Sequence, residues 1–206
     1  RSLLAVGWLE SATGRSGAAL GHLEESACLW QELGEARFAA RALDWAGYAT
    51  QALGRHREGA GFHRRAAALW RSAGALAEVA TALVYAGYCA SFDSDFAVAI
   101  PELEEAVLLA QEVGAEGTAA TALNNLGLAQ RGNGELRAAL ASFAVARPFA
   151  EAAGNRALGA ELHANRGNVL SDLGELEAAI DEYQLAVQGY RAAGNKRGEG
   201  QALSYI

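Results

Sequence analysis

The sequence predicts an all-α protein, a right-handed solenoid of stacked antiparallel helical hairpins. Three observations predict this fold class: glycines that return every 40 residues, apolar residues spaced by three and four, and a scarcity of proline and of β-branched residues. Only two prolines occur among 206 residues, and 51% of the residues are hydrophobic. Many of these are alanine, which favours helix and lets helices approach closely. Internal repetition of this length is typical of solenoids.

Three glycine series share the 40-residue step. The series are Gly34, Gly74, Gly114, Gly154 and Gly194; Gly7, Gly47, Gly87, Gly127 and Gly167; and Gly14, Gly54, Gly134 and Gly174, with Ser94 in the remaining place. We expect the first series to cap second helices in the left-handed conformation and the third to form the turn within each hairpin. The second series falls inside first helices, where glycine costs about 1 kcal/mol relative to alanine. It therefore predicts a neighbouring helix too close for a Cβ.

The segments between the glycines have the periodicity of amphipathic helices. One apolar stripe consists of Leu176, Ala179, Ile180, Tyr183, Ala186, Val187 and Tyr190. The repeat predicts units 1–34, 35–74, 75–114, 115–154 and 155–194, with a partial unit at 195–206. Since no linker or charge block separates them, we expect one continuous domain, 1–206. Pro101 and Pro148 fall inside second helices, where we expect kinks rather than helix ends.

The charge and the cysteines exclude several classes of protein. The formal net charge is −7 and no long basic run occurs, so the footprint of a nucleic-acid binder is missing. The most basic segment, 55–65, is interpreted as a solvated helix face. No stretch of 18 apolar residues predicts a membrane span, and no signal peptide is present. Cys28 and Cys89 lack metal-ligand spacing and are expected to be small buried residues of a cytoplasmic protein.

The motifs of catalysis are also missing from the sequence. No histidine pair has the helical spacing of a zinc site, and neither a phosphate-binding Gly-Lys-Ser/Thr loop nor a Gly-x-Ser-x-Gly elbow occurs. We therefore expect no enzyme activity, no cofactor and no metal site.

The spacing of small and large residues resembles that of the tetratricopeptide repeat (TPR). Gly167, Ala179, Tyr183 and Ala186 have this pattern, and Gly127, Ala139, Phe143 and Ala146 repeat it. Most such repeats have 34 residues, whereas the 40-residue form resembles arrays in large bacterial ATP-dependent transcription regulators and some cell-polarity adaptors. The segments 23–34 and 122–127 look most like the arrays of the transcription regulators. The resemblance implies a protein- or peptide-binding scaffold, the sensor or interaction arm of a larger bacterial signalling or transcription regulator.

The resemblance also implies that six positions of each first helix face a concave groove. Aromatic residues there are Trp8, Tyr48 and Tyr88, and amides are Asn124, Asn125, Asn165 and Asn168. The remaining candidate peptide-binding residues are Arg41, Asp44, Gln51, Leu128, Arg131 and Asp172. Aromatic residues are favoured in interfaces, and amides pair with peptide backbone in either sense. Two alternatives stay open: the aromatics pack between neighbouring first helices, and the asparagines hydrogen-bond locally.

Two rival functions come from other classes. The chain could be a structural spacer or self-association module, or a small-molecule sensor arm. Both ends of the sequence fall inside expected helices, which suggests a piece of a longer protein. We expect Leu203, Tyr205 and Ile206 to form an exposed apolar face that supports self-association through the C-terminal end.

Overall fold

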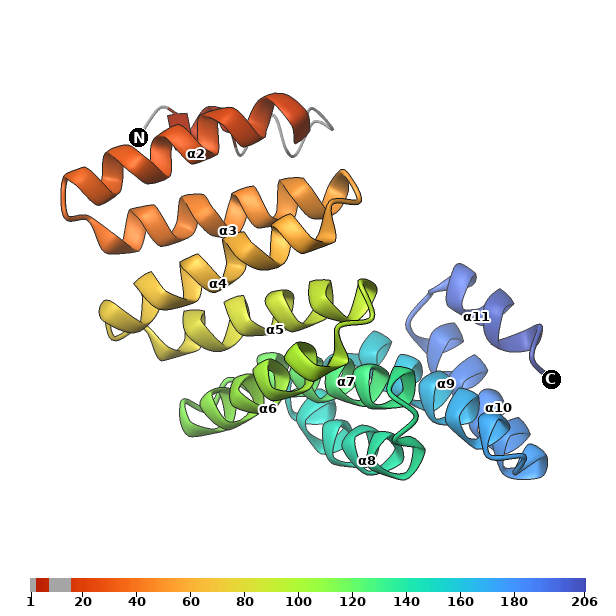
Figure 1. Ribbon diagram of the computed structural model, residues 1–206. Coiled ribbons are helices and arrows are strands. Elements are labelled where there is room, and N and C mark those ends of the chain that lie inside the picture. The colour runs from red at the N-terminus through yellow and green to blue at the C-terminus, as the bar shows by residue number, and fades with distance from the viewer. Residues whose placement is uncertain (1–2, 8–15) are drawn as a thin grey trace. The chain divides into compact units, whose positions relative to one another are not determined.

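A computed structural model of the chain describes residues 3–7 and 16–206, and its regular structure is helical throughout those residues (Figure 1). The helices after the short helical segment 3–7 are α2 (Ser16–Glu32), α3 (Ala36–Ala52), α4 (His56–Ser72), α5 (Leu76–Phe92), α6 (Phe96–Glu112), α7 (Glu116–Gly132), α8 (Leu136–Ala152), α9 (Arg156–Asp172), α10 (Leu176–Ala192) and α11 (Lys196–Leu203). The predicted all-α fold class is confirmed.

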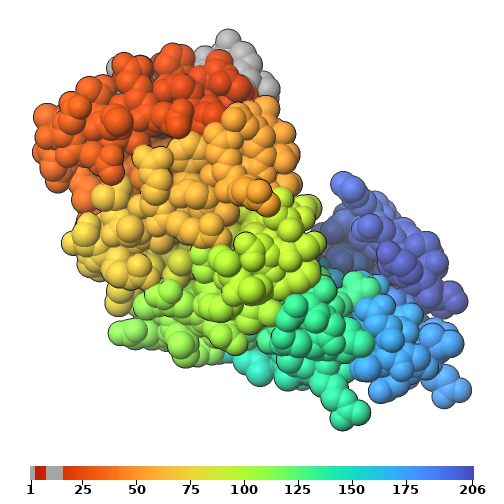
Figure 2. All heavy atoms as spheres, viewed as in Figure 1, coloured from red at the N-terminus to blue at the C-terminus, as the bar shows by residue number. Residues whose placement is uncertain are grey.

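The helices start at a constant interval. α3, α5, α7, α9 and α11 begin at residues 36, 76, 116, 156 and 196, and α4, α6, α8 and α10 begin at residues 56, 96, 136 and 176. Within residues 16–113, and likewise within residues 114–206, each helix packs against the next one in sequence, and the pairs form antiparallel hairpins. In the space-filling view, the atoms of α2 to α6 pack against one another from one helix to the next (Figure 2).

Contacts divide the chain into two compact units, residues 1–113 and 114–206. The first unit contains α2 to α6, and the second contains α7 to α11. The boundary coincides with the end of the third repeat expected from the sequence. The single continuous domain and the repeat boundaries remain predictions, and the two units are described separately below.

The turns confirm the roles predicted for two glycine series. Gly34 and Gly54 both have a φ of 73°, and the other described members of these series are also left-handed. The N–H of the next residue then donates to a carbonyl five residues back, as from Arg55 to Thr50 at 2.9 Å. This hydrogen bond satisfies a carbonyl that the helix end leaves free. Ser94, with a φ of 58°, adopts the same conformation despite its side chain.

The interior glycines confirm the predicted close approach. A Cβ on Gly167 would lie 2.6 Å from Cε1 of Tyr183, and one on Gly127 would lie 2.5 Å from Cε1 of Phe143. In each hairpin the obstructing side chain belongs to the large residue sixteen positions later in the second helix. A first helix can therefore cross its partner closely only where the Cβ is missing.

Two predictions about individual side chains were wrong. His63 is not part of a solvated basic face, because it fills the large-residue position opposite Gly47 and is fully buried. Cys28 is exposed, because it lies just outside the buried stripe of α2, whereas Cys89 is buried as expected.

α6 and α8 continue through Pro101 and Pro148, so neither proline ends its helix.

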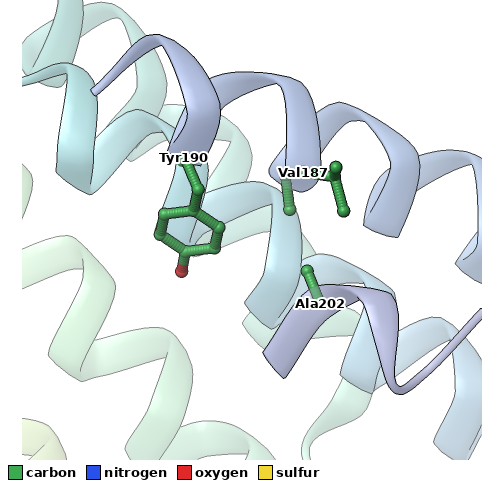
Figure 3. Close-up of a cluster of buried hydrophobic side chains, with 5 residues drawn as sticks. Val187, Tyr190 and Ala202 are labelled. Atoms are coloured by element: carbon green, nitrogen blue, oxygen red, sulfur yellow. The ribbon is translucent and has the colours of Figure 1, made fainter. Parts of the chain in front are cut away.

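The C-terminal end of the second unit is held by a small apolar cluster. Ala160, Ala186, Val187, Tyr190 and Ala202 bring together α9, α10 and α11 (Figure 3). A Cβ on Gly198 would lie 2.6 Å from Tyr190, so α11 crosses directly over this ring. The predicted exposed face at Leu203, Tyr205 and Ile206 is present, each being about half exposed. Self-association through that face remains a prediction.

In the described ranges, no helix is long and apolar enough to cross a membrane.

Candidate functional site

The predicted aromatic residues of the first unit pack mainly against other rings. Tyr48 of α3 lies edge-on to Tyr85 of α5, with ring centroids 4.7 Å apart, and contacts Trp45 at 5.5 Å. Tyr88 contacts Phe92 at 4.9 Å. Burial, then the neighbouring Tyr85 and Asp44, raises the pKa of Tyr48 far above its ordinary value. Packing between first helices, the alternative left open by the sequence, therefore describes Tyr48. Trp8 lies outside the described residues.

A buried polar network lies beside these rings. The amide nitrogen of Gln51 lies 2.9 Å from Nε2 of His63, which accepts its hydrogen bond, and Nδ1 of His63 lies 3.1 Å from the Asp44 carboxylate. The second carboxylate oxygen of Asp44 accepts from Nε1 of Trp70 at 2.7 Å. Asp44 and Gln51, both predicted groove residues, thus tie α3 to α4. Because His63 is fully buried, this Asp–His pair is not accessible to a substrate.

Arg41 is placed differently from the other candidates of the first unit. Its side chain is exposed and lines a surface hollow of about 460 Å³ at the turn between α2 and α3, with Gly34, Glu35 and Phe38. Arg41 has no ion pair among the residues that the structure describes. It is therefore available to an acidic partner.

Two of the predicted asparagines bind each other in the second unit. Nδ2 of Asn165 donates to Oδ1 of Asn124 at 2.9 Å, and Nδ2 of Asn124 donates to Glu161 at 3.3 Å. Both asparagines are buried, so they join α7 to α9 as in the local alternative. Asn125 and Leu128 are only partly buried. The amide of Asn125 has no hydrogen bond within the described residues.

Arg131 and Asp172, two further candidates, bind each other. Nε of Arg131 lies 2.6 Å from one carboxylate oxygen of Asp172, and Nη2 lies 3.3 Å from the other. A partner's carboxylate would have to displace Asp172 to bind Arg131. Asn168 accepts from the Tyr183 hydroxyl at 3.0 Å, and this contact leaves its amide N–H groups available.

A cavity of about 350 Å³ lies between α9 and α11. It is lined by Ala157, Glu161, Ala164, Asn165, Asn168, Tyr190, Asn195, Arg197, Gly198, Gln201, Ala202 and Tyr205. Asn165 and Asn168 are thus the two candidate residues that the structure brings together around this space. The lining offers carboxamides, tyrosines and two opposite charges, all suited to binding a polar ligand.

Sequence reasoning missed several residues of this lining. Glu161 and Gln201 occupy the first of the six groove positions in successive first helices, and Tyr205 occupies the third, one repeat after Asn165. Applying that rule to every unit, including the partial one, would have identified them. Arg197 is not at one of the six groove positions. It lines the cavity because α11 packs against Tyr190.

Side chains that could perform other chemistry do not gather in this way. In residues 3–7 and 16–206, no group of three His, Cys, Asp or Glu side chains is placed to hold a metal ion. Burial raises the pKa of the Cys89 thiol to about 11, so little of the reactive thiolate forms at neutral pH.

Comparison with known proteins gives the fold. No protein-family model and no curated protein matches the chain. Aspartyl phosphate phosphatase F from Bacillus subtilis matches with a TM-score of 0.85 and 11% identity over 98% of this chain and 53% of its own. The Rap conjugation gene regulator of plasmid pLS20, solved with the Phr peptide, matches with a TM-score of 0.72 and 19% identity over 97% and 55%.

A third solved structure matches this chain over nearly the whole length of both chains. The TPR-like repeats of a putative kinesin light chain from Podosopora anserina have a TM-score of 0.76 and 11% identity over 95% of this chain and 96% of theirs. By contrast, the chain spans about half the length of the phosphatase and of the Rap regulator. Together with the helical hairpins and their recurring glycines, these matches show that the chain has the fold of TPR-like helical-repeat proteins.

Proposed function

We propose that the chain is a peptide-binding repeat scaffold and that the cavity between α9 and α11 is part of its binding surface. The observation that carries this proposal is the cavity itself, about 350 Å³ in volume and lined mainly by side chains of the first helices α9 and α11. The Rap regulator, solved with the Phr peptide, has the same fold and supports the proposal by analogy alone.

The chemistry of the lining suits a peptide backbone. Asn168 and Gln201 each carry a donor and an acceptor, and Tyr205 offers a half-exposed ring. A hydrogen bond of this kind contributes a net of about 0.5–1.5 kcal/mol, so several must act together. A micromolar complex needs roughly −8 kcal/mol, so these hydrogen bonds must be joined by burial of apolar surface, for which the ring of Tyr205 is available.

The internal hydrogen bonds prepare this surface for binding. Asn124 and Asn165 bind each other across α7 and α9, so their positions are fixed before any ligand arrives. A preorganised site loses less conformational entropy on binding. Arg41, Tyr88, Asn125 and Leu128 remain proposed contacts elsewhere on the first helices.

The proposed context is a larger bacterial signalling or transcription regulator in the cytoplasm, in which this chain is the interaction arm and not an enzyme. Support comes from the fold shared with the Rap regulator, of which the chain spans about half. A small-molecule sensor is the second candidate, because 350 Å³ is within the range of cavities that hold small ligands.

The test is a selection of random peptides displayed on phage against the 206-residue chain, followed by affinity measurements by fluorescence anisotropy. The Gln201→Ala variant alters the cavity, whereas Gln188→Ala alters an exposed residue of α10 and is the matched control. We expect selected peptides to bind Gln201→Ala at least tenfold more weakly and Gln188→Ala unchanged.

Two results would overturn the proposal. One is a selection that enriches no peptide, which would favour the small-molecule or spacer functions. The other is a set of peptides whose affinity depends on Gln188 and not on Gln201, which would place binding outside the cavity.

A further inference from the structure

Two charged side chains of the cavity lining have no ion-pair partner within the described residues. Glu161 projects from α9 and Arg197 from α11, on the two helices that border the cavity. The carboxylate of Glu161 receives one long hydrogen bond, 3.3 Å, from the neutral amide of Asn124. Both residues are exposed, so water solvates their charges in the free protein.

Three other arginines of this unit form ion pairs. Arg131 binds Asp172 at 2.6 Å, Arg166 binds Glu182 at 2.9 Å, and Arg191 binds Glu199 at 2.6 Å. The unit therefore neutralises several of its arginines internally, while it leaves one acid and one base unpaired in the same cavity. Burial, and then the charge of Glu161, raises the pKa of Tyr190, which is consistent with a carboxylate near the cavity wall.

We infer that the cavity selects a peptide segment of mixed charge, with one basic side chain for Glu161 and one acidic side chain for Arg197. This inference rests on the proposed function, because it assumes that a peptide enters the cavity. The space equals that of on the order of ten water molecules, which suits two adjacent side chains and not a folded domain.

The remaining lining fits the same ligand. Asn168 and Gln201 bind the backbone between the two charged side chains, and the ring of Tyr205 covers their aliphatic stems. A ligand that carries a single charge would leave either Glu161 or Arg197 partly desolvated without compensation, and this loss creates the selectivity.

The test uses four acetylated and amidated hexapeptides in an alanine–glycine background. One carries a lysine and a glutamate two residues apart, two carry one of these with glutamine in place of the other, and one carries two glutamines. Binding is followed by NMR through the side-chain amide signals of Asn168 and Gln201, which report on the cavity itself. We expect the mixed-charge peptide to bind about threefold to tenfold more tightly than each single-charge peptide, and added salt to weaken this preference.

Four variants assign the charges. Glu161→Gln should remove the advantage of lysine only, and Arg197→Gln should remove that of glutamate only. Glu177→Gln on α10 and Arg137→Gln on α8, both at exposed residues without an ion pair in the described parts of the chain, are the matched controls. Glutamine at position 161 still accepts from Asn124, so the fold is preserved.

The outcomes separate the two proposals. If the neutral peptide shifts the two amide signals with the affinity of the mixed-charge peptide, the charge selection is wrong while the peptide site stands. The same conclusion follows if both cavity variants bind the peptides as the controls do. If none of the four peptides shifts the signals at millimolar concentration, the proposed peptide site itself fails.

Discussion

Two glycines of α9 differ in the space that a side chain would find, because one is tightly packed and the other is open. A Cβ on Gly167 would meet the Tyr183 ring at 2.6 Å, whereas one on Gly159 would meet nothing within 4 Å. Gly167→Ala should therefore lower the free energy of unfolding by about 1–3 kcal/mol through overpacking. Gly159→Ala should raise it by up to about 1 kcal/mol, because alanine favours helix. Urea denaturation measures both, and equal effects of the two substitutions would contradict the close-packing account.

Ser94 is a second residue whose role depends on its backbone. It has a φ of 58° at the hairpin turn where Gly134, with a φ of 82°, stands one repeat later. A side chain in this conformation costs roughly 1–2 kcal/mol, partly offset by the lower flexibility of serine in the unfolded chain. Ser94→Gly should thus raise the unfolding free energy by about 0.5–1 kcal/mol, and Gly134→Ser should lower it by a similar amount. If thermal denaturation shows Ser94→Gly to be destabilising, the serine contributes more than its backbone strain costs.

At the scale of elements, α9 and α10 are linked by one carboxylate. Glu182 of α10 lies 2.7 Å from Nδ1 of His163 and 2.9 Å from Nε of Arg166, both on α9. Burial alone would raise the pKa of Glu182, but His163 and Arg166 together lower it below its ordinary 4.5. The stabilisation is therefore complete above the unfolded pKa and is lost as the pH falls through the folded value.

Glu182→Gln should accordingly lose about 1 kcal/mol of stability at pH 7, a figure reduced for the partial exposure of the ion pairs. Between pH 6 and pH 3 its unfolding free energy should fall less steeply than that of the original chain. Urea denaturation across this range gives the slopes, and Glu177→Gln on the same helix is the control. Parallel slopes for all three proteins would mean that Glu182 does not link the helices.

The elements were predictable from the sequence for definite physical reasons. A left-handed turn needs glycine and a close helix crossing excludes a Cβ, so Gly34 and Gly167 indicate both the repeat and its geometry. The repeat register puts His63 in the large-residue position opposite Gly47, but it does not show that Asp44 and Gln51, both on α3, hydrogen-bond to its ring. A basic residue on a helix looks solvated until those partners are known.

At the scale of the whole molecule, the candidate site was only partly predictable. Repeat positions led to Asn165 and Asn168, which line the cavity, and their part in binding remains a prediction. They could not show that Asn165 binds Asn124 or that Arg131 binds Asp172, since both pairs join residues about 40 positions apart. The contribution of Arg197 depends on the packing of α11 against Tyr190, which no single-helix pattern encodes.

The central claim is that a peptide binds between α9 and α11, and a crystal structure of the chain with a selected peptide tests it most directly. The account predicts density for an extended segment in the cavity, with Asn168 and Gln201 hydrogen-bonded to its backbone. Density for the peptide on the outer faces of α8 or α10, with the cavity filled by water alone, would contradict it.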